Sequence, residues 1–316
     1  ELFIALQETV EKVSYTSSEN GLDEVLAKWK ALRDGQFTPE PGRPPDVTGS
    51  PWRVYGNKVV EANKELVLLA GIGSREREKL RGAGIHRVDQ LWNISLEESS
   101  EVLGSHYGPT AYYVAQAYKI GQPISKPKSP LVIPRAKRHL YFDFETSDDV
   151  HPTQPPHVYL IGCWDAERSQ YVHFLARGAE DEGKIFKQFI EYIGDVPKSK
   201  LYHWTGFEIG EIHNVIQRWP VMEEPLLRLT SSCVDLKEMV KSAVYLPVPT
   251  FSLKCVAPAL GFRWRQEGFG AFESMVCYWD YLDGADESTI ARSILYNEDD
   301  CRAMWHVDCE LTKRFA

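Results

Sequence analysis

Residues 140–146, LYFDFET, place two carboxylates inside a run of large apolar residues. Successive side chains of a strand point to opposite faces, so Asp143 and Glu145 share one face and the two phenylalanines take the other. Two like charges buried side by side are costly unless a cation lies between them. That cation can be a Lys or Arg in a structural salt bridge or a bound metal ion, and this stretch alone leaves both explanations open.

The composition is that of an ordinary globular protein. The 316 residues, 43% hydrophobic and 26% charged, are enough for two or three domains. No apolar run of about 18 residues and no signal-peptide pattern is present, so we expect a cytoplasmic protein with no membrane partner. The formal charge of −9 excludes a uniformly basic surface. It leaves nucleic acid as a partner, because local basic patches can bind phosphate.

All six cysteines lie in the second half of the chain, and none forms a C-x-x-C pair. They favour free thiols in a reducing cytoplasm over a disulfide framework or a zinc site. The chain begins with Glu rather than Met, from which we expect a trimmed piece of a longer protein.

The first 138 residues divide into three regions. Residues 1–64 contain an expected helical start at 1–10, a helix at 21–35 and then a Pro/Gly-rich irregular connection. Residues 65–121 show helical periodicity with Gly-rich turns. Residues 122–138 carry four prolines and five Lys/Arg with no acid, which predicts an extended linker.

From residue 139 to residue 316 the pattern predicts an α/β domain. RHLYFDFET, HVYLIGCWD and YVHFLAR are three consecutive strands with connections short enough for an antiparallel meander. A helix at 179–193, the strand KLYHWTG, the helix FEIGEIHNVIQRW and a long helix at 287–315 follow. Together they favour a mixed sheet flanked by helices.

Further candidate site residues occur on the last helix and after a later strand. Tyr296 and Asp300, four apart in YNEDD, share one face of the last helix. Glu298 and Asp299 point elsewhere, and we expect them to be solvated. Glu208 follows the strand KLYHWTG, at a strand end where functional groups are common in α/β sheets.

The order of these residues resembles the DEDDy branch of the DnaQ-like 3′–5′ exonucleases, which have the ribonuclease H fold. The resemblance implies that Asp143, Glu145, Glu208 and Asp300 hold two divalent metal ions and that Tyr296 orients the attacking water. Two ions about 3.5–4 Å apart can activate a water and stabilise the leaving oxygen of a phosphodiester. A site of carboxylates alone suits Mg²⁺ or Mn²⁺.

One departure concerns Glu208, because the second motif usually offers Asp. The segments HWTGFE, YNEDDC and FSLK are similar to the branch of this fold attached to predicted RecB-family nucleases, where a Glu occurs at this place. Residues 1–64 resemble the tail of a RecB-like nuclease domain, which makes such a domain, N-terminal to this chain, a candidate partner. No cysteine precedes residue 163, so no iron–sulfur cluster is predicted. Residues 1–64 contain no Asp…Glu-x-Lys active-site pattern, so no second nuclease centre is predicted either.

The middle region resembles a helix–hairpin–helix element at 68–92, with a degenerate second copy at 95–119. In that motif the glycines, here Gly71 and Gly73, let the backbone approach a nucleic-acid phosphate. Positive charge is added by Arg75, Arg77, Lys79 and Arg81. The alternative is a helical packing module with glycine caps.

Three further features have two explanations each. Lys254 in FSLK is either a contact for a substrate phosphate or a surface lysine. His203 could be a base, although a residue that packs at a strand end is favoured. The aromatic residues of 262–281 suit core and loop packing better than a platform for stacking bases.

The sequence therefore predicts a metal-dependent nuclease, a 3′–5′ exonuclease acting on DNA or RNA with two Mg²⁺ or Mn²⁺ ions. The alternative function is a non-catalytic nucleic-acid-binding module that uses the helix–hairpin–helix region while the nuclease fold serves as scaffold.

Overall fold

The computed structural model describes residues 2–5, 10–13, 23, 26, 27, 29–31, 33–36, 52–147 and 155–315. The chain forms two compact units, Glu1–Val60 and Glu61–Ala316. In the described part of the chain, no helix has both the length and the apolar character needed to cross a bilayer.

The N-terminal unit begins with strands. β1 (Leu2–Ala5) and β2 (Val10–Val13) pair antiparallel, so the helical start expected over residues 1–10 is wrong. A short apolar run such as LFIA suits a strand as well as a helix, and its periodicity cannot separate the two. The described residues of the helix expected at 21–35 are helical from Asp23 to Arg33, whereas the Pro/Gly-rich residues 37–51 lie outside the described part.

The middle region is helical, as expected. Its elements are η1 (Leu66–Leu68), α3 (Ser74–Gly82), η2 (Val88–Asn93) and α4 (Leu96–Ile120). The helix α2 (Trp52–Asn63), which precedes this region, was not predicted. Helix α4 is broken at Gly104, which has φ 81°. A Cβ on Gly108 would lie 2.4 Å from the backbone of Ser100, so the two arms of α4 approach each other closely after this turn.

The α/β domain is built on a five-stranded mixed sheet. Its strands are β4 (Arg138–Ser147), β5 (His157–Asp165), β6 (Gln170–Leu175), β7 (Ser199–His203) and β8 (Cys233–Asp235). They lie in the order β6-β5-β4-β7-β8. The predicted antiparallel meander is β4–β5–β6, and β7 and β8 join it in parallel.

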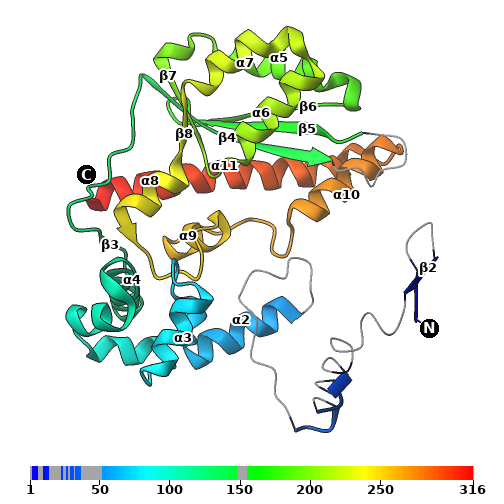
Figure 1. The fold of residues 1–316 in the computed structure, drawn as a ribbon. Coiled ribbons are helices and arrows are strands. Elements are labelled where there is room, and N and C mark those ends of the chain that lie inside the picture. The colour runs from blue at the N-terminus through cyan, green and yellow to red at the C-terminus, as the bar shows by residue number, and fades with distance from the viewer. Residues whose placement is uncertain are drawn as a thin grey trace. The chain divides into compact units, whose positions relative to one another are not determined.

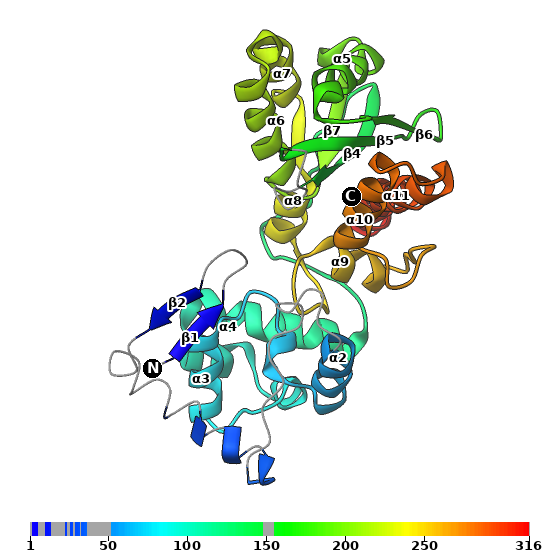
Figure 2. The ribbon, with the colours of Figure 1, turned by 90° about the vertical axis from the view of Figure 1, so that its right-hand side faces the viewer.

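Helices cover both faces of this sheet (Figures 1 and 2). They are α5 (Glu182–Ile193), α6 (Phe207–Arg218), α7 (Glu223–Thr230), α8 (Leu236–Ala243), α10 (Ala271–Leu282) and α11 (Glu287–Phe315). The short helix α9 (Leu253–Ala259) packs against α11. Helices α5, α6 and α7 lie on one side, and the long α11 runs along the other beside α10 (Figure 1). The predicted mixed sheet flanked by helices is confirmed.

The two faces of β4 are divided as the alternation of LYFDFET requires. Phe142 and Phe144 are buried in one core cluster with Phe186 and Phe189 of α5. Tyr141 belongs to the other cluster, which includes residues of α11. Asp143 and Glu145 follow Tyr141 on that second face, so the acids of β4 meet the last helix.

The segment 122–138 is fastened to the α/β domain. Its strand β3 (Ile124–Ser125) pairs with β9 (Val244–Tyr245). Leu131 and Ile133 are buried in the core cluster of α11, and the guanidinium of Arg135 donates to both carboxylate oxygens of Asp308 at 2.5 and 2.6 Å. The extended segment is therefore held along its length by packing and an ion pair.

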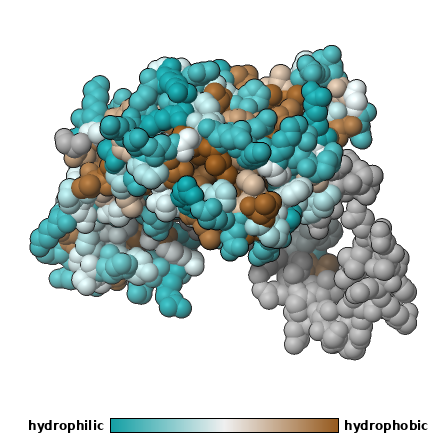
Figure 3. Space-filling model, turned by 90° about the horizontal axis from the view of Figure 1, so that it is seen from above, coloured by the Kyte–Doolittle hydropathy of each residue, from teal (hydrophilic) through white to brown (hydrophobic). Residues whose placement is uncertain are grey.

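The surface seen in Figure 3 is mainly hydrophilic, with hydrophobic side chains gathered near its middle. All six cysteines are free thiols, as predicted, and three of them are buried. Burial raises the pKa of the Cys163 and Cys301 thiols, which makes them poor nucleophiles.

Candidate metal centre

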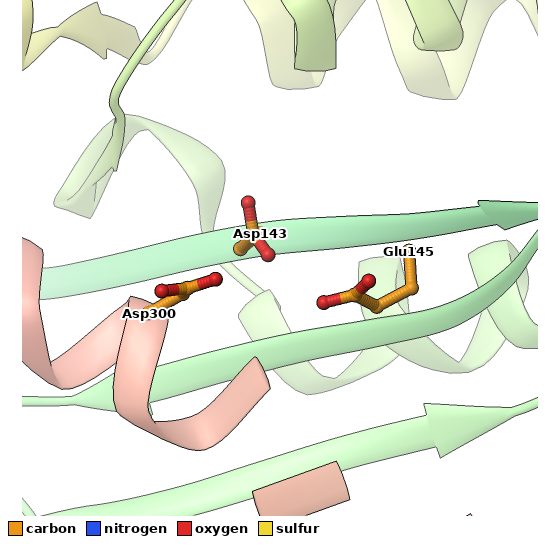
Figure 4. Close-up of side chains that lie close together, drawn as sticks. All are labelled: Asp143, Glu145 and Asp300. Atoms are coloured by element: carbon orange, nitrogen blue, oxygen red, sulfur yellow. The ribbon is translucent and has the colours of Figure 1, made fainter. Parts of the chain in front are cut away.

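Three carboxylates converge between β4 and α11. Asp143 and Glu145 project from β4 and Asp300 from α11, and one oxygen of each lies within 4.8 Å of the others. Figure 4 shows the three side chains pointing toward one another. Glu145 is 5% exposed and Asp300 is 7% exposed, so the group lies mostly out of water.

The three acids oppose one another's ionisation. Burial first, and then the charges of Glu145 and Asp300, raise the pKa of Asp143 well above its usual range. Burial first, and then the charge of Asp300, raise the pKa of Glu145 to about 8, although a hydrogen bond from Asn297 acts in the opposite direction. Without a further cation, the protein holds these acids together at a cost in free energy.

Asn297 lies directly behind the two strand acids. Its amide Nδ2 is 3.0 Å from Asp143 Oδ2 and 3.4 Å from Glu145 Oε1. Its Oδ1 accepts a hydrogen bond of 2.9 Å from the hydroxyl of Tyr171. The side chain is fully buried, so this amide fixes the separation of the acids.

Strand β5 leaves room for that amide because it has no side chain at the crossing point. Gly162 pairs with Asp143 in the β4–β5 register. A Cβ on Gly162 would lie 1.6 Å from Asn297 Oδ1 and 2.7 Å from the hydroxyl of Tyr171. The glycine is therefore required by the close approach of α11 to the sheet.

Asp300 has two donors of its own. Lys254 Nζ lies 2.5 Å from Asp300 Oδ1, and the indole Nε1 of Trp264 lies 2.7 Å from the same oxygen. Neither Asp143 nor Glu145 forms an ion pair with a Lys or Arg of the described residues. The salt-bridge explanation thus holds for Asp300 and leaves the two acids of β4 without such a partner.

Tyr296 lies one turn before Asp300 on α11 and is 5% exposed. Burial first, and then the nearby charges of Asp300 and Glu145, raise its pKa further above the ordinary value of 10. The hydroxyl therefore stays protonated near neutral pH. It can donate a hydrogen bond and cannot serve as a base.

Glu208 occupies the turn after β7, as predicted, at the start of α6. It lies outside the group of three acids, although its charge adds to the rise in the pKa of Asp143. Its Oε2 is 3.5 Å from His203 Nδ1 and 3.4 Å from the hydroxyl of Thr205. His203 is buried beside Phe142, in keeping with the packing role favoured for it.

The glycines and basic residues of the first hairpin lie at the protein surface. Gly71 has φ 83°, and Gly73 precedes the first turn of α3. Arg75 and Lys79 are exposed on α3, whereas the guanidinium of Arg77 donates to the carbonyl of Ile72 at 2.8 Å. Arg77 thus supports the hairpin itself.

One prediction in this part of the chain is wrong. Asp299 was expected to be solvated, but it is 2% exposed and accepts hydrogen bonds from the backbone N–H and Nε of Arg265 at 2.8 and 2.7 Å. Helix periodicity places Asp299 away from the site but does not show which loop covers that face.

Three neighbours of the acids were not predicted from the sequence: Asn297, Trp264 and Gly162. Asn297 could have been found, because it lies three residues before Asp300 and shares a helix face with it. Trp264 belongs to the aromatic segment assigned to packing, and nothing local links it to Asp300. Gly162 is a single glycine in an apolar strand, and no local signal marks it.

The acids suit a hard divalent cation. The donor set is carboxylate oxygen alone, which Mg²⁺ and Mn²⁺ prefer. The three oxygens are near enough to one another to share one ion, and a divalent charge would remove the repulsion that raises the pKa of Asp143 and Glu145. The residues present therefore fit a metal ion.

Comparison with known proteins supports the same assignment at the level of the family. No curated protein matches the chain significantly. A family model of the RNase H superfamily matches residues 140–312, more than half of the 316 residues. This range begins at β4 and ends within α11, and so includes all three converging acids. The chain therefore belongs to the RNase H superfamily, whose fold is of the nuclease type.

Proposed function

We propose that this chain is a metal-dependent nuclease that hydrolyses phosphodiester bonds of DNA or RNA from the 3′ end. One observation carries the proposal: three mutually repelling carboxylates, two of them buried and one half-buried, are held together. Proteins keep so unfavourable a group chiefly where a cation or a reaction needs it. Membership of the RNase H superfamily supports the reaction class.

Asp143, Glu145 and Asp300 would hold the first divalent ion. When bound, such an ion polarises the phosphate and lowers the pKa of a water molecule. The resemblance to DEDDy exonucleases assigns Glu208 to a second ion. Its place at the start of α6 supports that role, although it is not a member of the group of three acids.

Tyr296 would orient the attacking water. Its hydroxyl is protonated and buried beside Asp300, so it can donate or accept a hydrogen bond without adding charge. Asn297 and Trp264 position the acids from behind and from the side. The proposal that hydrolysis starts at the 3′ end rests on the resemblance to DEDDy exonucleases. Tyr296, Asn297 and Trp264 could serve hydrolysis from either end.

The hairpin residues would bind a part of the nucleic acid other than the bond that is hydrolysed. Gly71, Gly73, Arg75 and Lys79 are exposed around the first turn of α3, where backbone N–H groups can meet a phosphate. Arg77 would act mainly by holding the hairpin through Ile72.

The test is degradation of DNA and RNA oligonucleotides that carry a label at one end, with Mg²⁺, Mn²⁺ or EDTA. We expect cleavage with either metal, none with EDTA, and shortening that starts at the 3′ end. Asp143→Asn should lower the rate at least about 10³-fold, because it removes a ligand of the ion. Asp195→Asn, at an exposed acid paired with Lys198, is the matched control and should keep full activity.

Two outcomes would reject the proposal. Undiminished cleavage by Asp143→Asn would show that the activity comes from elsewhere. Tight binding of an oligonucleotide without any cleavage, by the unchanged chain in Mg²⁺ and Mn²⁺, would favour the non-catalytic binding module.

A further inference from the structure

Lys254 lies in a cage that holds its ammonium group against Asp300. Its Nζ is 2.5 Å from Asp300 Oδ1. The same Nζ lies 4.1 Å from the ring centroid of Trp264 and 4.2 Å from that of Tyr296. A carboxylate and two aromatic faces together form a favourable site for one cation.

The cage is built from three elements. Lys254 belongs to the first turn of α9, Trp264 to the loop between α9 and α10, and Tyr296 to α11. Trp264 also donates its indole N–H to the oxygen that Lys254 contacts, and Phe269 packs against Tyr296. These contacts hold the lysine in one position, while 43% of its side chain remains exposed and accessible to a ligand.

The charges favour one divalent ion beside this lysine. Asp143, Glu145 and Asp300 carry at most three negative charges, and Lys254 with one divalent ion carries three positive charges. A second divalent ion at Asp300 would have to approach a resident ammonium group. Glu208, the acid that would bring another negative charge, lies outside the group of three and contacts His203.

We propose that, in the absence of nucleic acid, Lys254 takes the place beside Asp300 of the second divalent ion assigned above to Glu208, so that the free chain binds one divalent ion. The inference rests on the proposed nuclease function and deepens it. The exposed side of the ammonium group then serves as the positive charge that meets a substrate phosphate.

The experiment counts Mn²⁺ ions on the metal-free chain, without nucleic acid, by the paramagnetic resonance signal of unbound Mn²⁺. The unchanged chain should bind one ion tightly. Lys254→Met keeps the length of the side chain and removes its charge, so it should bind two ions. The affinity for the second should rise by about tenfold or more, because a neighbouring positive charge is removed.

Two variants serve as controls. Lys254→Arg keeps the charge in the cage and should keep one ion. Lys187→Met removes an exposed lysine of α5 whose ion pair with Glu191 is 4.0 Å long, and it should also keep one ion. If Lys254→Met fails to fold by circular dichroism, Lys254→Gln takes its place in the same titration.

Each result decides the proposal. Two tight ions on the unchanged chain, or one ion on both the unchanged chain and Lys254→Met, would overturn the role of Lys254 while leaving the nuclease assignment intact. No ion on the unchanged chain would likewise overturn the role of Lys254. If cleavage then also survives Asp143→Asn, the assignment of the nuclease site to these acids is overturned as well.

Discussion

The role of Tyr296 can be tested separately from that of the neighbouring acids by removing one oxygen atom, its hydroxyl. The hydroxyl of Tyr296 is protonated and carries no charge, whereas Asp300 one turn further along α11 is a member of the acidic group. A change that removes only the hydroxyl therefore tests the handling of water without altering the charge that attracts a metal ion.

We expect Tyr296→Phe to lower kcat by about 10²–10⁴-fold, the range typical of a positioned proton-handling group. The rise in melting temperature with Mn²⁺ should survive. Tyr281→Phe on the same domain, at a partly exposed tyrosine of α10, is the control and should leave kcat unchanged. Loss of the Mn²⁺ effect in Tyr296→Phe would instead assign the hydroxyl to metal binding.

The raised pKa of Glu145 should make the metal-free protein less stable as the pH rises. In the folded, metal-free protein its pKa is about 8, against about 4.3 in an unfolded chain. Between these values the folded protein retains a proton that the unfolded chain releases, so stability falls as the pH rises. Asp143, whose pKa is also raised, acts in the same direction.

The melting temperature in EDTA should therefore fall between about pH 5 and about pH 8 more steeply in the unchanged chain than in Glu145→Gln. Added Mn²⁺ should restore stability at the upper pH in the unchanged chain, because the ion binds the folded state and compensates the charge. Equal slopes for the two proteins in EDTA would show that Glu145 is not held as a neutral acid.

At the scale of the element, β4 and α11 could be read from the sequence, and their crossing with β5 could not. The alternation of LYFDFET predicts which side chains share a face, and the four-residue spacing of Tyr296 and Asp300 predicts a common helix face. The structure confirms both expectations. The position of Asn297 between Gly162 and the acids depends on how α11, β5 and β4 pack together. A local sequence pattern does not predict such a contact.

Gly162→Ala tests that crossing. The added methyl group would lie 1.6 Å from Asn297 Oδ1, so the amide must move away from Asp143. We expect a loss of stability of about 1–3 kcal/mol from overpacking and a loss of Mn²⁺ affinity of about 10–100-fold, as is usual when a partner of a metal ligand is displaced. Calorimetry and Mn²⁺ titration measure the two effects.

Gly210→Ala is the matched control, because Gly210 lies within α6 and has open space at its Cβ position. Alanine is the better helix former by about 0.5–1 kcal/mol, so this variant should be neutral or slightly more stable with unchanged Mn²⁺ affinity. Full Mn²⁺ affinity in a folded Gly162→Ala protein would show that Asn297 does not position the acids.

At the scale of the whole molecule, sequence patterns are weakest where distant segments pack together. The prolines and basic residues of 122–138 predict an extended chain, and the segment contains no helix and includes the short strand β3. The burial of Leu131 and the pairing of Arg135 with Asp308 depend on α11, and that ion pair joins residues 173 apart in the sequence. For the same reason the helical start expected at 1–10 is wrong: four apolar residues do not distinguish a strand from a helix without their partner strand.

The hairpin region should contribute to substrate binding and not to the reaction at the metal centre. Arg75 and Lys79 are exposed on α3, whereas Arg77 holds the carbonyl of Ile72 and Arg81 contacts Glu78. Reversal of Arg77 or Arg81 would disturb the hairpin itself. The sharper variant therefore combines Arg75→Glu with Lys79→Glu.

This double variant should raise KM on long oligonucleotides and reduce the slope of log KM against log salt by about 0.7–0.9 for each phosphate that the protein no longer neutralises, because fewer counterions are released on binding. Turnover at saturation on short oligonucleotides should be nearly preserved, since no acid of the metal centre is changed. The same reversal at Lys184 and Lys187, exposed on α5, controls for net charge and should leave the salt slope as it was. If both double variants give the KM and salt slope of the unchanged chain, the hairpin region is a packing module. The nucleic acid must then be held by the α/β domain alone.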